Sequence, residues 1–145
     1  MLKLVVLATL FASTAYAFEL VTPDEVSQSQ DALMLEADLS VPDPLGPLIQ
    51  LLEPVSLEMP FKNPFKMEVL FKAQNGSSID FATFKAFYGA FKLDITDRLL
   101  KEAVKTSSGL RLANVNIPSG RHKLYISIKD NLGHITAKEI AFKVE

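Results

Sequence analysis

Two histidines are the residues best suited to chemistry in this sequence, because imidazole binds metals and exchanges protons near neutral pH. They are His122 and His134, in a chain of 145 residues that contains no cysteine. The residues between them alternate between apolar and polar, which predicts a strand. About seven residues of strand, each rising about 3.3 Å, place the two rings roughly 23 Å apart. One ion cannot bridge that distance, so we predict no metal site. We expect the His122 ring to bond nearby backbone at a corner and His134 to be an exposed turn residue.

A second candidate site is the polar set Asp94, Thr96 and Arg98, whose members alternate along the chain. If this segment is extended, all three side chains share one face. Arg98 would then bind a carboxylate through two parallel hydrogen bonds. That carboxylate is either Asp94, which makes the set an internal tie, or a group on a ligand. If the segment is helical, the three side chains are dispersed around a turn.

Other catalytic arrangements lack their sequence signals. A serine nucleophile needs an activating base, but the serines at 107–108 and 119 stand beside glycines in predicted turns, and no G-x-S-x-G motif is present. A carboxylate pair for glycoside cleavage needs a cleft, and a domain of this size has little material for one. Calcium needs clustered oxygen ligands, whereas Asp130-Asn131 is typical of a turn. We therefore expect no enzyme activity and no cofactor.

The charge and cysteine content exclude further classes of function. The chain carries 15 basic and 17 acidic residues, for a net charge of −2. Nucleic-acid binding needs a clustered basic surface that displaces counterions, and the lysines here are scattered singly. No disulfide, thiol nucleophile or cysteine metal site can form. The stability of the fold must come from buried apolar side chains.

The clearest element is a hairpin over residues 121–144. Its first half alternates apolar with polar residues, Asp130 to Gly133 forms the turn, and Ile140, Phe142 and Val144 alternate on the return. Period-two alternation is typical of a strand with one buried face. Asp suits the first position of a type I turn and Gly the last. We interpret this hairpin as the last two strands of an antiparallel sandwich.

The rest of the domain is predicted to contain five more strands and one helical segment. The strands are expected at 48–52, 65–73, 84–88, 91–95 and 110–117, the last with a bulge because its alternation is imperfect. A short helix at 96–104 has two apolar pairs at helical spacing, Leu99 with Ala103 and Leu100 with Val104. Asp94 or Thr96 is its expected N-cap, and we expect it to cross between the sheets. Turn residues separate strands at intervals of about 8 to 12 residues, which indicates a sandwich or barrel.

The N-terminal residues are predicted to be a signal peptide over 1–17. Lys3 precedes an apolar run at 4–12, and Ala15-Tyr16-Ala17 has the small-x-small pattern of a cleavage site. Cleavage after Ala17 leaves Phe18 first. No later segment is apolar enough to cross a membrane, so we expect a soluble exported protein, periplasmic or extracellular. Residues 18–47 contain four prolines and no basic residue, and we interpret them as a linker with a short helix at 32–39.

Leu70 and Phe87 suggest a partner surface. Both occupy positions that the alternation assigns to the outside of a strand. If the two strands are neighbours, these side chains form an exposed apolar patch, which usually marks a binding surface. An error in the assigned register is the competing explanation. The absence of Trp disfavours a platform for stacking sugars.

The hairpin motif resembles one in bacterial immunoglobulin-like and fibronectin type III-like domains. Those domains commonly read G-x-Y-x-L-x-V-x-V-x-D-x-x-G, and the present sequence reads Gly120-x-His122-x-Leu124-x-Ile126-x-Ile128-x-Asp130-x-x-Gly133. The likeness covers residues 48–144, with His122 at the place of the family's Tyr and without the antibody cysteine pair or Trp. It implies an all-β, Ig-like antiparallel β-sandwich of about seven strands, and it carries over no catalytic activity.

These observations lead to an ordered set of functional expectations. The first is an exported, non-enzymatic Ig-like domain at 48–145 that serves as a protein-protein interaction or accessory module of the bacterial cell envelope. Its surface would include Leu70, Phe87, Asp94, Thr96 and Arg98. The alternative is a module that binds carbohydrate or cell-envelope glycan. A small enzyme is third, because it requires a cleft with a perturbed carboxylate or histidine.

Overall fold

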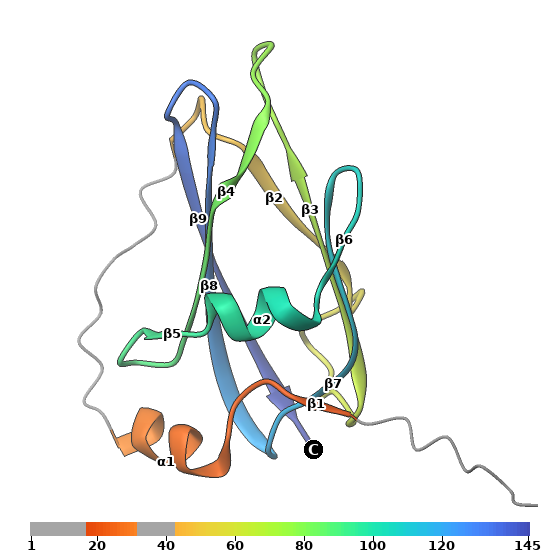
Figure 1. Ribbon diagram of the computed structural model, residues 1–145. Coiled ribbons are helices and arrows are strands. Elements are labelled where there is room, and N and C mark those ends of the chain that lie inside the picture. Colours follow the sequence, from red (N-terminus) through yellow and green to blue (C-terminus); the bar gives the residue numbers. More distant parts are fainter. Residues whose placement is uncertain (1–16, 32–42) are drawn as a thin grey trace, which may run out of the picture.

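The computed structural model describes residues 17–31 and 43–145, which form mostly β structure with two helices (Figure 1). The elements in chain order are β1 (Phe18–Glu19), α1 (Pro23–Asp31), β2 (Leu48–Glu53), β3 (Phe65–Lys72), β4 (Ile79–Tyr88), β5 (Leu93–Asp94), α2 (Thr96–Glu102), β6 (Val104–Lys105), β7 (Gly109–Asn116), β8 (Gly120–Asp130) and β9 (Ile135–Val144). No helix in these ranges is long and apolar enough to cross a membrane.

The strands form two sheets that enclose one hydrophobic core (Figure 1). One sheet has the order β1-β7-β3-β2, with β6 also paired to β7, and the other has the order β5-β4-β8-β9. Neighbouring strands are antiparallel, except that β1 runs parallel to β7. Each sheet buries its inner side chains against the other sheet, so the core lies between the two layers.

The period-two pattern produces the predicted strands in both sheets. In β3 the residues Phe65, Met67, Val69 and Phe71 are buried, and the residues between them are partly or fully exposed. The hairpin of β8 and β9 is confirmed, with ten consecutive residue pairs and His122 opposite Phe142. Its turn is closed by a hydrogen bond of 3.1 Å from the N–H of Gly133 to the carbonyl of Asp130. Gly133 has a φ of 88°, which glycine adopts at little cost.

Four elements differ from the predicted ranges or refine them. Strand β4 begins at Ile79, whereas β5 is only Leu93–Asp94 and is shorter than the predicted strand at 91–95. Helix α2 forms where predicted but ends at Glu102, and it connects β5 of one sheet to β6 of the other. The bulge predicted in β7 is present, since Asn114 has a φ of 55° and the β3–β7 register shifts beside it.

The N-terminal strap (residues 18–31) packs on the domain, where the sequence suggested a linker. Leu20, Val21 and Val26 belong to the core. Helix α1 starts with Pro23 as its first residue and with a capping box. In this box the N–H of Thr22 donates to Oε2 of Glu25 at 2.8 Å, and the N–H of Glu25 donates to Oγ1 of Thr22 at 3.3 Å. The predicted helix at 32–39 and nearly all of the predicted signal peptide lie outside the described residues.

Candidate functional site

The structure does not bring Leu70 and Phe87 together. Leu70 lies in β3 and Phe87 lies in β4, and these strands belong to different sheets. Each side chain is partly exposed on the outer side of its own sheet. The outer sides of the two layers face opposite directions. The apolar patch that requires both residues therefore does not exist, because the connection from β3 to β4 crosses from one sheet to the other.

Asp94 and Thr96 organise the start of α2. Oδ1 of Asp94 accepts a hydrogen bond of 2.9 Å from the N–H of Thr96. The Thr96 side chain lowers the pKa of Asp94 through its own hydrogen bond, and the Thr96 N–H acts in the same direction. Oγ1 of Thr96 accepts from the N–H of Ala86 at 2.9 Å and donates to its carbonyl at 3.3 Å. Thr96 therefore fixes the start of α2 to β4, and Asp94 binds the first residue of the helix. Neither Asp94 nor Thr96 serves as the helix N-cap, which is Ile95.

Arg98 binds a carboxylate through two hydrogen bonds, but the partner is Glu25 of the N-terminal strap. Nη1 and Nη2 lie 2.8 Å and 2.9 Å from the two Glu25 oxygens, and Nη1 also donates to the carbonyl of Leu20 at 3.0 Å. The Arg98 hydrogen bond lowers the pKa of Glu25, with partial opposition from burial. Arg98 is therefore neither tied to Asp94 nor open to a ligand carboxylate.

His122 has the corner role that the sequence predicted. Its Nε2 lies 2.7 Å from the carbonyl of Pro118, which can only accept, so Nε2 carries the proton. Nδ1 therefore accepts from the Tyr88 hydroxyl at 2.8 Å. Burial lowers the pKa of His122 and raises the pKa of Tyr88 to about 12. Both ring nitrogens are thus engaged in the interior, away from any substrate.

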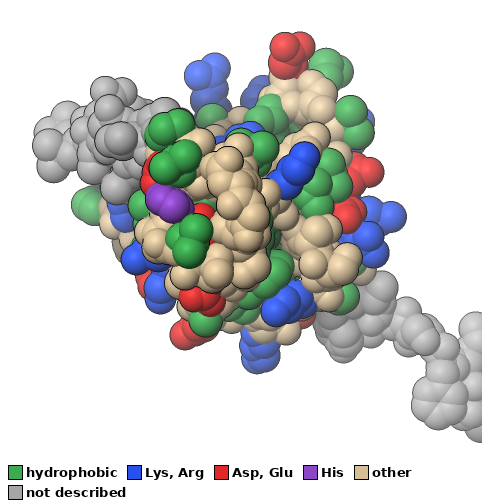
Figure 2. All heavy atoms as spheres, turned by 90° about the horizontal axis from the view of Figure 1, so that it is seen from above, with side chains coloured by type: hydrophobic (Ala, Val, Ile, Leu, Met, Phe, Trp, Pro, Cys, Tyr) green, Lys and Arg blue, Asp and Glu red, His purple; other side chains and the backbone are tan. Residues whose placement is uncertain are grey.

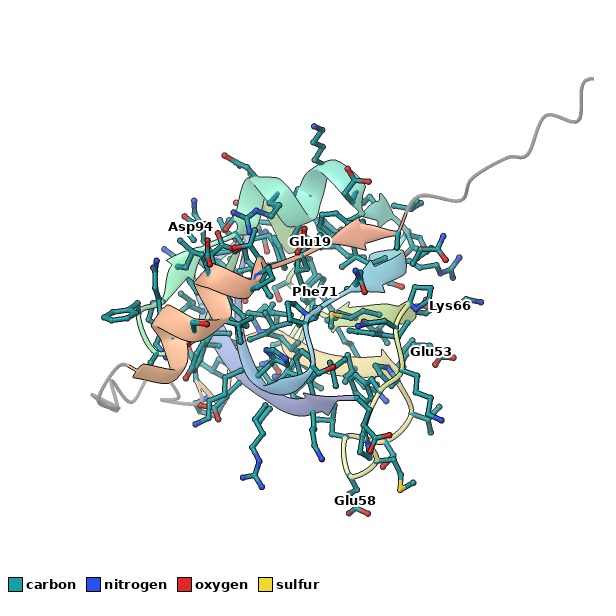
Figure 3. The ribbon with its side chains drawn as sticks, turned by 90° about the horizontal axis from the view of Figure 1, so that it is seen from below. Glu19, Glu53, Glu58, Lys66, Phe71 and Asp94 are labelled. Carbon is teal, nitrogen blue, oxygen red and sulfur yellow. The ribbon has the colours of Figure 1, made fainter. Side chains whose placement is uncertain are left out.

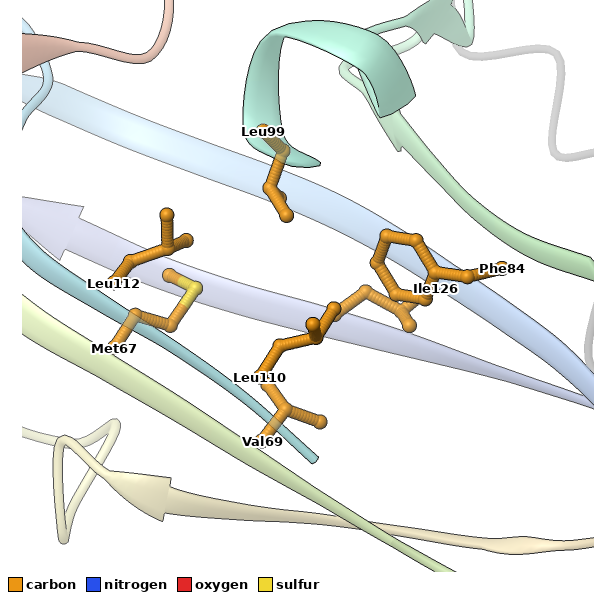
Figure 4. Close-up of a pocket in the computed structure, with 7 residues that line it drawn as sticks. All are labelled: Met67, Val69, Phe84, Leu99, Leu110, Leu112 and Ile126. Atoms are coloured by element: carbon orange, nitrogen blue, oxygen red, sulfur yellow. The ribbon is translucent and has the colours of Figure 1, made fainter. Parts of the chain in front are cut away.

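The interior cavity between the sheets is too small for a ligand. Seven apolar side chains line it, and they are Met67, Val69, Phe84, Leu99, Leu110, Leu112 and Ile126 (Figure 4). The cavity holds about 10 Å³, close to the space of one water molecule. Its walls offer a water almost no polar partner. Among residues 17–31 and 43–145, no three His, Asp or Glu side chains are placed to hold a metal.

Three segments meet at one end of the domain and form what we call the loop tip, residues 43–48, 74–78 and 130–135 (Figure 1). The N–H of Asn131 donates to the carbonyl of Ser78, and the N–H of Ser78 donates to Oδ1 of Asn131, both at 2.9 Å. The side chain of Gln74 donates to the carbonyl of Gly46 at 2.6 Å. These hydrogen bonds hold the three segments together as one surface.

Asp130 anchors the β8–β9 turn from beneath this surface. Its buried carboxylate accepts from the N–H groups of Leu132 and His134 at 2.9 Å and from Nδ1 of His134 at 3.0 Å. Burial opposes the charged form of Asp130, but the hydrogen bonds from His134 and Leu132 outweigh it and lower the pKa. His134 is therefore half-buried and bonded, and the expectation of a freely exposed turn residue is wrong. The anchored turn presents Leu132 outward.

Four large apolar side chains project from the loop tip and form the tip patch. Their exposed fractions are 49% for Leu45, 50% for Leu48, 63% for Leu132 and 46% for Ile135. The segments that carry these side chains approach each other, because a Cβ on Gly46 would lie 3.1 Å from the carbonyl of Ile135. Figure 2 looks onto this end and shows hydrophobic side chains gathered beside a histidine. Exposed apolar side chains on a hydrogen-bonded frame are typical of a binding surface.

The opposite end of the domain carries both apolar and charged exposed side chains. Val55 and Met59 are exposed there, in the connection from β2 to β3. Glu53, Glu58 and Lys66 at this end point outward (Figure 3). Charged residues thus interrupt the apolar surface at this end, which makes the tip patch the stronger candidate.

Two residues of the tip patch stand out in the sequence, although the search for strand patterns did not single them out. Leu132 stands inside a turn, where polar residues are usual. Leu45 stands between Pro44 and Gly46, in a segment interpreted as a linker. An apolar residue in a turn has no sheet to bury it, and this is the signal that sequence analysis missed. None of the five residues predicted for the site lies in the tip patch.

Comparisons with protein-family models, with curated proteins and with solved structures give no match to this chain. The site is therefore judged on its geometry.

Proposed function

We propose that this chain is an exported immunoglobulin-like domain that binds another protein through the loop tip. The strand order supports the fold assignment. Immunoglobulin-like sandwiches pair strands A, B and E in one sheet and C, F and G in the other. Numbered from β2, the present sheets place β2, β3 and β7 together and β4, β8 and β9 together. Strand β5 then occupies the additional C′ position beside β4.

Export is supported by the position of the first strand. Strand β1 begins at Phe18, the residue that follows the expected cleavage site at Ala17. A chain cleaved there keeps every residue of the N-terminal strap. We propose the bacterial cell envelope or its surroundings as the compartment, in which a domain without cysteine folds independently of disulfide chemistry.

The single observation that carries the binding function is the tip patch on its hydrogen-bonded frame. Immunoglobulin-like domains bind through the loops at one end of the sandwich, and two of those loops correspond to the β3–β4 and β8–β9 turns here. Leu45, Leu48, Leu132 and Ile135 would bury apolar surface against a partner. A frame that is already ordered loses little entropy on binding. The protein would act as a binding module and not as a catalyst, since its buried histidine and its paired arginine are both engaged within the fold.

Site-specific crosslinking in the native organism tests the proposal. A photoreactive amino acid replaces Leu132 in one variant and Leu100 in the control, where Leu100 is an exposed leucine on α2 away from the loop tip (Figure 1). We expect one discrete protein adduct from position 132 and none from position 100. The absence of a protein adduct at 132, or equal adducts from both positions, contradicts the proposal.

A further inference from the structure

Among residues 17–31 and 43–145, no backbone hydrogen bond pairs one edge of strand β9 along much of its length. At its end, the carbonyl of Lys143 accepts from the N–H of Phe61 at 2.8 Å, and the N–H of Glu145 donates to the carbonyl of Phe61 at 2.9 Å. In an antiparallel strand, alternate residues direct both backbone groups to the same edge. The N–H and C=O groups of residues 137, 139 and 141 therefore point to the edge that Phe61 occupies. Within the described ranges, no hydrogen bond engages these groups.

Phe61 already pairs with the C-terminal end of this edge. It forms an isolated parallel bridge with Val144, one residue long. The chain then turns away toward β3. The pairing that Phe61 begins is thus left incomplete from Ala141 back to Ala137, and a segment from another molecule can continue it.

Strand β9 carries few of the features that protect edge strands. It contains no proline, and its ten pairs with β8 run without a register shift. Ala137 and Ala141 offer small side chains beside the open edge. Lys138 is the one inward charge, and its Nζ donates to the carbonyl of Ile49 in β2 at 3.2 Å. Lys138 therefore joins the two sheets, while its own backbone groups face β8 and not the opposite edge.

On the basis of the proposed function, we propose that the partner supplies an extended segment that adds to β9 as a further strand. The open edge and the tip patch are continuous, because Ile135 begins β9 and belongs to the patch. The segment would pair its backbone with residues 137–141 and place apolar side chains against Ile135 and Leu48. Backbone pairing gives such complexes affinity, and side-chain contacts give them selectivity. The proposed partner segment is thus an extended stretch of chain that is unpaired before binding and apolar at one end.

A display library of random twelve-residue peptides, selected on the purified chain, supplies the probe. The binding constants of selected peptides are then measured on Ala141→Pro and Ala141→Val. Proline at 141 removes an edge N–H without removing a bond to β8, whereas valine keeps the N–H and favours a strand. We expect Ala141→Pro to weaken binding by about tenfold or more and Ala141→Val to change it by less than about threefold. Melting curves of both variants verify that the domain remains folded.

Amide hydrogen exchange gives a second readout that does not depend on substitution. In the free chain, the amides of Ala137, Glu139 and Ala141 should exchange rapidly, and those of Lys138 and Ile140 slowly. Bound peptide should protect the first three. A library that yields no binder, or peptides that bind Ala141→Pro as tightly as the unmodified chain, overturns the added strand. Loss of binding in Leu132→Ser with an unaffected Ala141→Pro variant would retain the loop tip as the binding surface and remove only the edge.

Discussion

Arg98 on α2 and Glu25 on α1 form a two-bonded ion pair between residues separated by 73 positions. The pair joins the N-terminal strap to the helix that crosses between the sheets. Ser29 strengthens the same attachment, since its hydroxyl accepts from the N–H of Ala90 at 2.9 Å. The strap is therefore a part of the folded domain, and its removal should affect stability.

Replacement of Leu20 tests this integration. Leu20 has no exposed surface, and truncation of a fully buried leucine leaves a cavity. We expect Leu20→Ala to lower the free energy of unfolding by about 2–5 kcal/mol. Glu19→Ala, at an exposed neighbouring position, should change it by less than about 0.5 kcal/mol. Urea titration of both variants provides the comparison, and equal stabilities would mean that the strap is not part of the cooperative unit.

The ion pair itself should give a dependence on acid pH. Glu25→Gln keeps the shape of the capping box but removes the charge, and we expect a loss of about 1 kcal/mol at pH 7, because Arg98 is partly exposed to solvent. The pKa of Glu25 is lowered in the folded state. The contribution of the charge is therefore complete above pH 4.5 and is lost as the pH falls below that value. The melting temperatures of the two proteins should converge in acid. A difference in melting temperature that does not change with pH would exclude the charge of Glu25 as its cause.

The buried pair of Tyr88 and His122 should affect the stability of the fold in a different pH range. Tyr88→Phe leaves Nδ1 of His122 without a donor, and we expect a cost of about 1–3 kcal/mol. The pKa of His122 is lowered by burial, so the unfolded chain takes up its proton first. Stability should then decline as the pH falls below 6.5. Calorimetry from pH 8 to pH 5.5 should show this decline in the unmodified protein and a smaller decline in His122→Gln. An identical decline in both proteins would mean that titratable groups other than His122 cause the loss of stability.

Gly109 marks the closest approach between β7 and β3. A Cβ at this position would overlap the carbonyl oxygen of Val69, so Gly109→Ala must push the two strands apart. We expect a loss of about 3 kcal/mol or more. Gly76→Ala is the matched control, since Gly76 has open space around it and a φ of 74°. It should cost only about 1–2 kcal/mol. If thermal melting shows that both variants lose the same stability, the steric account of Gly109 is incorrect.

The strands were predictable from sequence where one face of each strand is buried. The β8–β9 hairpin and β3 show this, because alternation directly records which side chains enter the core. The range of β5 was not predictable, since its two residues pair with β4 through contacts that the alternation does not encode. The strap was missed because the four prolines in residues 18–47 suggested a linker. Thr22-Pro23-Asp24-Glu25 is nevertheless a capping box with Pro at the first helical position, which is a local helix signal.

The site was less predictable than the fold. Leu70 and Phe87 were correctly placed on outer faces, but whether their strands share a sheet depends on long-range topology. Arg98 was expected, in an extended segment, to bind Asp94 or a ligand carboxylate, but the segment is helical and the partner is Glu25, 73 residues away in the sequence. The tip patch combines residues from segments more than 80 positions apart. Only the folded chain brings Gly46, next to Leu45, against the backbone of Ile135.

The affinity of the crosslinked partner for three forms of the chain tests the central claim most directly. Leu132→Ser removes apolar surface from the tip patch, and Leu100→Ser removes similar surface from α2, where the leucine is also exposed. We predict that Leu132→Ser weakens binding by about tenfold or more, the loss expected for one buried leucine contact. Leu100→Ser should bind as the unmodified chain does. Unchanged binding by Leu132→Ser, or an equal loss in Leu100→Ser, would contradict the assignment of the loop tip as the binding surface.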